Sequence, residues 1–257
     1  MMEFGSQRSY SAFARPVCRD LRFIRSTDSD RFLDTVLAMI SSRHVTIGEG
    51  TVLWRAQVGH GLRTENHGED EFEVPCAFPP KRMKPLSDRA ADGRVNPKGI
   101  PCLYLATKKE TAICEVRPWI GSYVSVAQFA TTRVLNILDF GRDSMSSKIY
   151  LEEPKPHERT LAVWSDIDRA FSEPMTRTDD SADYVPTQII AELLRKEGFD
   201  GIAYRSSIGE AGYNIALFNL EAAEVKNCGL RRIDKIVMEF SQQDNPYFVK
   251  KGKNEKS

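Results

Sequence analysis

The sequence lacks the features that mark several large classes of protein. Its 36 Lys and Arg residues are balanced by 36 Asp and Glu residues, so the formal net charge is zero. A chain without net charge has no general attraction for nucleic acid or for an anionic membrane, and we expect neither to be the main partner. No apolar run reaches the roughly 18 residues of a membrane-spanning helix, and residues 1–25 are polar with scattered arginines. The sequence therefore predicts no transmembrane helix and no export signal.

The five cysteines also show no spacing typical of a metal site or of a disulfide framework. They form no CxxC pair and have no histidine nearby at the spacing of zinc ligands, so we expect neither a metal site nor a disulfide framework. Scattered cysteines of odd number indicate a reducing compartment, which favours a cytoplasmic location. Cys102 and Cys114 lie among apolar residues, and we expect them to be buried thiols and not nucleophiles.

Glycine-rich nucleotide motifs are absent as well. The sequence contains neither GxGxxG nor GxxxxGK[ST], so neither a Rossmann nor a P-loop site is supported. The composition is otherwise that of an ordinary globular protein, with 41% hydrophobic and 28% charged residues. A folded chain that binds nucleotides must then do so by another architecture.

The chain divides by composition into three parts. Residues 1–44 predict an N-terminal extension with one helix, over 30–42, where apolar residues recur at helical spacing. Residues 45–241 predict one catalytic domain that contains a long polar loop over 59–99. Residues 242–257 predict a flexible basic tail, because lysines cluster there.

Within the central part, period and turn residues predict the order of the elements. A helix that begins at Thr107 with a capping box and ends before Pro118 directly follows a short strand. Two further helices are expected, one on the stripe from Leu161 to Phe171 and one from Pro186 to Gly198. Strands are expected at 45–58, 100–106, 123–129, 134–140, 199–205, 213–220 and 232–240. This order is not the regular βαβ alternation, so we expect an α+β fold with a mixed or antiparallel sheet core and flanking helices.

Four segments place polar residues at or just after apolar strands, and each has an ordinary structural explanation by itself. Glu115 is less easily explained. It lies in the apolar helical stretch 112–116, where an ionised carboxylate costs free energy unless a partner or a function compensates for it. The four segments are Trp54-Arg55, Arg94-Val95-Asn96, Tyr104 with Glu115, and Tyr204-Arg205-Ser206.

Taken together and in order, the segments resemble the RES domain, a family named for its Arg, Glu and Ser. The resemblance runs from about Val45 to Leu220 and rests on Leu53-Trp-Arg55, Arg94-Val-Asn-Pro-Lys-Gly-Ile-Pro-Cys-Leu-Tyr-Leu-Ala106, Thr111-Ala-Ile-Cys-Glu-Val116, Phe199-Asp-Gly-Ile-Ala-Tyr-Arg-Ser206 and Asn214-Ile-Ala-Leu-Phe218.

The resemblance implies an ADP-ribosyltransferase-like fold and a bacterial toxin paired with a helix-turn-helix antitoxin of the Xre type. Its members degrade NAD⁺ by hydrolysis or phosphorolysis, and some transfer ADP-ribose to protein. The positions that match the family's active-site residues are Arg55, Arg94, Tyr104, Glu115 and Ser206, to which we add Asn214 as a residue that binds NAD⁺. Ser207 is the alternative motif serine, but Ser206 is preferred because it lies two residues after Tyr204.

The chemistry of these residue types fits that implication. Arg55 and Arg94 suit a pyrophosphate, because the planar guanidinium binds phosphate oxygens with two parallel hydrogen bonds. Tyr104 offers a flat face for the cationic nicotinamide ring. Glu115 would stabilise positive charge on the ribose or hold its hydroxyls. Ser206 would position a group and would not be a nucleophile, because no histidine is placed to activate it. NAD⁺ is then a substrate, and no metal or other cofactor is expected.

Three hypotheses about function remain open at this point. The first is an NAD⁺ glycohydrolase or phosphorylase, the second a protein mono-ADP-ribosyltransferase, and the third a non-catalytic interaction module. The extension and the loop 59–99 exceed what a compact toxin of this type requires, and the loop contains rival arginines for phosphate in Arg63, Arg82 and Arg89.

Overall fold

The computed structural model describes residues 3–68, 70–86, 88–142, 152–173, 181–208 and 212–241. Within these ranges the main sheet is formed by β1 (His44–Ile47), β2 (Val52–Val58), β5 (Leu103–Ala106), β6 (Tyr123–Thr131), β7 (Leu135–Asp139), β8 (Gly201–Arg205), β9 (Tyr213–Leu217) and β10 (Ala223–Arg232). Its strand order is β1-β7-β8-β9-β5-β2-β6-β10. Only the pair β7 and β8 is parallel among these neighbours. The expected α+β fold with a mixed, mostly antiparallel sheet is confirmed.

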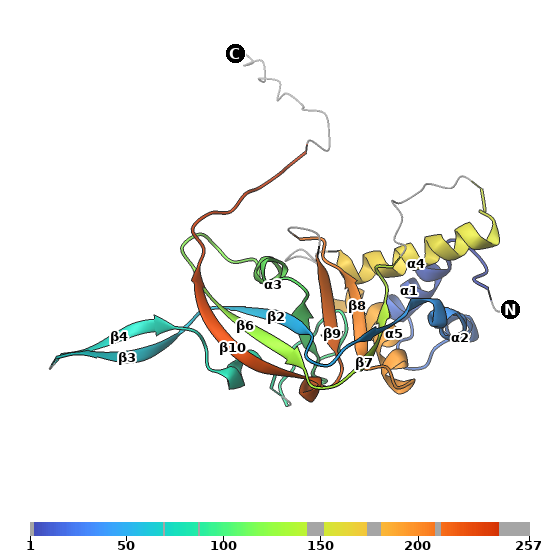
Figure 1. Ribbon diagram of the computed structural model, residues 1–257. Coiled ribbons are helices and arrows are strands. Elements are labelled where there is room, and N and C mark those ends of the chain that lie inside the picture. The colour runs from blue at the N-terminus through green and yellow to red at the C-terminus, as the bar shows by residue number, and fades with distance from the viewer. Residues whose placement is uncertain are drawn as a thin grey trace, which may run out of the picture.

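The described helices are α1 (Ser9–Arg19), α2 (Thr27–Met39), α3 (Lys109–Glu115), α4 (Pro156–Ser172) and α5 (Val185–Lys196). Proline in the first turn opens both α4 and α5, and Gly198, with a φ of 86°, follows the end of α5. Four helices, α1, α2, α4 and α5, gather at one end of the sheet, whereas α3 lies apart from them (Figure 1). None of the helices in the described part of the chain is both long and apolar enough to cross a membrane.

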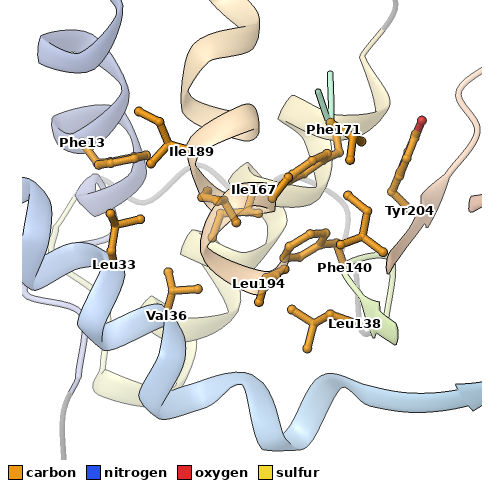
Figure 2. Close-up of a cluster of buried hydrophobic side chains, with 14 of the residues drawn as sticks. Phe13, Leu33, Val36, Leu138, Phe140, Ile167, Phe171, Ile189, Leu194 and Tyr204 are labelled. Atoms are coloured by element: carbon orange, nitrogen blue, oxygen red, sulfur yellow. The ribbon is translucent and has the colours of Figure 1, made fainter. Parts of the chain in front are cut away.

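The largest core joins those four helices to strands β7, β8 and β9 (Figure 2). Aromatic rings carry much of it: Phe13 stacks on Phe32 with ring centroids 4.6 Å apart, and Phe140 stacks on Phe171 at 4.7 Å. Phe171 in turn lies 5.9 Å from the ring of Tyr204. Because α1 and α2 contribute to the same core as the sheet, the N-terminal residues are an integral part of the fold.

The expectation of one helix in residues 1–44 is wrong, because α1 precedes α2. Helix α1 buries Phe13 and Val17, with Tyr10 packed against the same core, and contains Pro16. Its apolar residues recur at helical spacing, but an internal proline argues against a helix. The proline therefore concealed α1 in the sequence.

The expectation of a loop without regular structure over 59–99 is also wrong in part. Strands β3 (Gly61–His67) and β4 (Asp70–Cys76) form an antiparallel hairpin that projects from the main sheet (Figure 1). The hairpin has polar residues on both faces, so it lacks the alternation by which a half-buried strand is recognised. The 3₁₀ turn Pro80–Met83 follows and completely buries Met83.

The last strand is displaced from its expected place. Strand β10 occupies Ala223–Arg232 and pairs with β6, whereas the expected strand 232–240 forms no regular element. The edge strand β10 has few buried side chains, and the apolar residues Val237, Met238 and Phe240 gave the following segment the stronger β pattern. The predicted basic tail, 242–257, lies outside the described residues.

Candidate active site

A cavity of about 310 Å³ lies between β2, β5 and α3. It is lined by Trp54, Arg55, Ala56, Gly93, Arg94, Tyr104, Leu105, Ala106, Ala112, Glu115, Val116, Tyr184, Tyr204 and Asn214. Five of the six predicted site residues are in this lining, and the sixth, Ser206, contacts Glu115 directly. The rival arginines are elsewhere: Arg63 pairs with Glu65, Arg82 lies over the Phe78 ring, and Arg89 pairs with Asp88.

Arg55 brings a half-buried positive charge, with its Nε fully buried, into this cavity from β2. Its Nη1 donates to the backbone oxygen of Tyr104 at 2.9 Å, and its Nε is buried with no hydrogen-bond partner. No carboxylate among the described residues forms an ion pair with it, and burial lowers the pKa of the guanidinium. A buried cation without an anion is costly, so this position favours an anionic ligand.

Arg94 reaches the cavity from the segment before β5. Its Nη1 donates to the backbone oxygen of Phe171 at 2.5 Å, near the C-terminal end of α4. This carbonyl holds one edge of the guanidinium. The positive charge of Arg94 is also favourable near the C-terminal end of α4, which is the negative end of the helix dipole. Arg94 therefore ties α4 to the cavity wall, in addition to lining the cavity.

Tyr104 has its hydroxyl fully engaged by that same segment. The hydroxyl donates to Asn96 Oδ1 at 2.7 Å and accepts from the Val95 backbone N–H at 3.0 Å. Burial raises the pKa of Tyr104 well above its ordinary value, so the phenol stays neutral. Gly93 is required here, because a Cβ at that position would lie 2.4 Å from the Tyr104 hydroxyl. What Tyr104 offers to a ligand is thus its ring.

Glu115 is the last residue of α3, and its side chain is exposed. The expected cost of burying a carboxylate does not arise, because the side chain is exposed, although Ala112 and Val116 line the same cavity. Its Oε1 accepts a hydrogen bond from Ser206 Oγ at 2.7 Å and another from Asn214 Nδ2 at 2.7 Å. None of the described residues donates to Oε2. One oxygen is fixed by the protein, and the other is free for a ligand.

The two donors to Glu115 come from neighbouring strands. Asn214 lies in β9, where it pairs with Ala106 of β5 and Tyr204 of β8, and Ser206 follows the end of β8. Ser207 points elsewhere, because its hydroxyl donates to the backbone oxygen of Ser172 at 2.5 Å. Of the two adjacent serines, Ser206 is the one at the carboxylate.

The start of α3 differs from its prediction. Lys108 is the N-cap residue, and no side chain caps the helix, so the expected capping box at Thr107 is wrong. The Thr107 hydroxyl instead accepts from the Tyr213 backbone N–H at 3.1 Å, and its own N–H donates to the Tyr213 carbonyl at 2.9 Å. These bonds fasten the turn between β5 and α3 to the start of β9, next to Asn214.

Part of the cavity wall is not predicted by the sequence. The motifs include Trp54 only as the neighbour of Arg55, and they do not include Tyr184, from the 3₁₀ turn Ser181–Tyr184. Tyr184 follows a polar stretch and precedes Pro186, and no local pattern distinguishes it from a helix-start residue. In the described ranges, no three His, Cys, Asp or Glu side chains are grouped so that they could hold a metal ion.

The geometry so far defines an α+β domain whose sheet and one short helix bring an arginine, a tyrosine and a carboxylate to one cavity. A family model for the RES domain matches residues 75–234, which is more than half of the chain, and the chain belongs to that family. The matched region includes Arg94, Tyr104, Glu115, Ser206 and Asn214, whereas Arg55 precedes it.

Among curated proteins, none matches this chain. Among solved structures, the chain is similar to one in the crystal structure of the M. tuberculosis MbcT–MbcA toxin–antitoxin complex, with 14% sequence identity and a TM-score of 0.41. The similarity covers 77% of this chain and 92% of that chain.

Proposed function

We propose that this protein cleaves the bond between nicotinamide and ribose in NAD⁺, as a glycohydrolase or a phosphorylase. The observation that carries the proposal is the arrangement at Glu115, whose Oε1 is held by Ser206 and Asn214 at the edge of a cavity that also contains Arg55. Membership of the RES domain family supports the same assignment.

The reaction needs few groups from the protein. When the glycosidic bond breaks, its electron pair leaves with nicotinamide, which departs as a neutral ring, and the ribose acquires oxocarbenium character. A carboxylate beside the ribose stabilises that positive charge, and hydrogen bonds that fix one carboxylate oxygen keep the other in place. Water or inorganic phosphate then bonds to C1″, the ribose carbon that nicotinamide has left, and gives up a proton. Free Oε2 of Glu115 is the group that would accept the proton of the water or orient the ribose hydroxyls.

The pyrophosphate of NAD⁺ would account for Arg55. Its half-buried guanidinium has no ion-pair partner among the described residues, and its buried Nε has no acceptor there. A phosphate oxygen in the cavity would supply both, with the short hydrogen bonds typical of arginine and phosphate. Tyr104, whose hydroxyl is engaged, would contribute its ring face to the nicotinamide side. NAD⁺ is a substrate in this proposal, and no further cofactor takes part.

The biological role follows the family. We propose that the protein is a cytoplasmic toxin of a toxin–antitoxin pair, in which loss of NAD⁺ stops growth and a helix-turn-helix antitoxin of the Xre type blocks the cavity. The support for this role is membership of the RES domain family alone. Co-expression of the neighbouring gene product should then restore NAD⁺ and growth.

Transfer of ADP-ribose to a protein is the second candidate. It is favoured by the exposure of Glu115, which would allow an acceptor larger than water to reach the ribose. A non-catalytic role is harder to reconcile with a half-buried arginine that lines a cavity and has no ion-pair partner among the described residues.

The products of labelled NAD⁺ distinguish these alternatives. The purified protein is incubated with NAD⁺ labelled in the adenylate half, with and without inorganic phosphate, and separately with cell lysate. Free ADP-ribose indicates hydrolysis, ADP-ribose 1″-phosphate that forms only with phosphate indicates phosphorolysis, and label on lysate proteins indicates transfer. Unchanged NAD⁺ in all three reactions would contradict the proposal.

A further inference from the structure

Residues 234–240 have the sequence of a β-strand but pair with no strand in the described part of the chain. The β-branched and aromatic residues of this segment predict a strand, and the chain is extended there without regular structure. It follows directly from the edge strand β10 and leads away from the body of the molecule (Figure 1). The sequence of the segment therefore favours a β-strand, whereas the described chain offers it no strand to pair with. Such a segment is suited to an intermolecular contact.

The pairing with the main sheet ends at one residue. Ile233 donates its N–H to the Ser122 carbonyl at 3.0 Å and accepts from the Gly121 N–H at 2.7 Å. No backbone hydrogen bond of residues 234–240 to any described residue is present. Ile233 also packs against a small core with Ala56 and Val126. The segment is thus anchored at Ile233 and offers its backbone groups beyond that point.

The side chains of the segment are unusually apolar for an exposed position. Val237 is 75% exposed, Met238 76% and Phe240 97%. Neighbouring apolar side chains that are exposed together mark an interaction surface more often than scattered ones do. An edge strand without protection is also a template for pairing with another chain.

The order of charges in the segment identifies the partner. Lys235 precedes the apolar run Ile236–Met238, and Glu239 follows it. Neither charged side chain forms an ion pair within the described residues. An antiparallel copy of the same segment, centred on Val237, puts each Lys235 directly opposite a Glu239. It also puts Ile236 opposite Met238, so residues 235–239 are complementary in charge and in apolar contact, whereas Asp234 faces Phe240.

We propose that residues 234–240 pair with the same residues of a second copy of this chain as an antiparallel two-stranded ribbon. The two-fold axis passes between the two Val237 residues. Such a contact is isologous: Lys235 of each copy meets Glu239 of the other. The two copies meet through these segments, and each keeps its own cavity. The association is weak, because a two-stranded ribbon alone is marginally stable in water.

A charge exchange tests the partner and the register together. Sedimentation velocity over a range of protein concentrations measures the dimer dissociation constant of the full chain. Lys235→Glu or Glu239→Lys alone places like charges opposite each other at two symmetric positions and weakens the dimer roughly tenfold. The double variant Lys235→Glu with Glu239→Lys restores the opposite charges and returns the dissociation constant to that of the wild type.

A cysteine at the axis tests the geometry. Residues directly opposite in an antiparallel pair have Cα atoms about 4.5–5.5 Å apart, which a disulfide can span. Under mild oxidation, the Val237→Cys variant should form a disulfide that joins the introduced thiols of two copies, identified by mass spectrometry of the linked peptide. The matched control is Val134→Cys, at a valine that is 54% exposed elsewhere on the molecule, and it should not form a symmetric link.

Each outcome decides the proposal. A chain that stays monomeric at all concentrations, or a dimer that ignores the single charge reversals, would overturn it. So would a Val237→Cys variant that cross-links no better than Val134→Cys. These readouts do not depend on NAD⁺ cleavage, so this proposal and the proposed function can fail separately.

Discussion

At the scale of single residues, Glu115 is in a position that fold stability does not explain. A carboxylate on the last residue of α3 lies at the negative end of the helix dipole, where acidic residues are unfavourable. Two hydrogen-bond donors on neighbouring strands are directed at one of its oxygens. A costly residue that is supported by dedicated partners is typical of a functional site.

The donor from β9 leads to a first prediction. Asn214→Leu keeps the approximate shape of a buried side chain but removes the hydrogen bond to Glu115, so the carboxylate loses its fixed orientation. We expect kcat for NAD⁺ cleavage to fall by roughly ten- to a hundredfold, with a smaller change in KM. The control is Asn227→Leu on β10, where the exposed amide donates to Gln128. Equal losses in both variants would show that Asn214 has no special role.

The adjacent serines give a second, internally controlled prediction. Ser206→Ala removes a donor to Glu115, whereas Ser207→Ala removes a bond to the end of α4. Turnover of NAD⁺ should fall several-fold in the first variant and stay close to that of the wild type in the second. The reverse order would identify Ser207 as the motif serine and contradict the assignment.

Cys102 provides a prediction about reactivity. Burial raises the pKa of its thiol to about 12, because the ionised form has no solvation there. We expect iodoacetamide to modify half-exposed Cys76 at neutral pH and to leave Cys102 intact until the protein unfolds. Since the folded pKa is above the ordinary value of about 8.5, the thiol favours folding below that pH and loses this contribution as the pH rises toward 12. Peptide mapping with and without denaturant measures the difference.

At the scale of elements, helices α1 and α2 stabilise the fold through the aromatic core. Phe13→Ala removes a ring that is 2% exposed and stacked on Phe32, and should lower the free energy of unfolding by about 3–5 kcal/mol. Phe23→Ala, at a phenylalanine that is 91% exposed just beyond α1, should change it by less than about 0.5 kcal/mol. Chemical denaturation measures both. Equal effects would mean that the N-terminal helices do not belong to the core.

The elements that could be predicted are those with a strong period. Helices α4 and α5 have apolar stripes and proline in the first turn, and β6 and β7 have buried apolar residues on both sides. Helix α1 has apolar residues at helical spacing but contains Pro16, which argues against a helix. The β3–β4 hairpin has polar residues on both faces, which favours a loop. A strand was expected at 232–240, but the structure has β10 at Ala223–Arg232. Apolar content alone therefore does not decide strand pairing, because β10 pairs with β6 through its backbone while few of its side chains are buried.

At the scale of the whole molecule, the sheet brings the candidate site together from distant parts of the chain. Arg55, Tyr104 and Asn214 lie on β2, β5 and β9, which are neighbours in the sheet although they are far apart in sequence. The ordered motifs predicted which residues meet, because they resemble a known family. They did not predict that Ser206 and Asn214 share one oxygen of Glu115, or that Tyr184 closes the wall, because such contacts depend on tertiary packing.

The whole molecule also extends beyond the part that the family model matches. Residues before 75 contribute Arg55 to the cavity and α1 and α2 to the core. Arg43, at the end of the 3₁₀ turn after α2, is buried and donates to the Phe140 carbonyl at 3.1 Å, with its guanidinium carbon 4.6 Å from the centre of the Trp164 ring. The N-terminal region is therefore fixed to the domain that carries Glu115.

The most direct test of the central proposal is the release of nicotinamide from NAD⁺ by the purified protein, compared with Glu115→Gln. The account predicts release by the wild type and a loss of at least roughly a hundredfold in the variant, whose circular dichroism and unfolding midpoint stay close to those of the wild type, because Glu115 is exposed and only its charge is removed. Equal release by both proteins, or no release by a folded wild type, would contradict it.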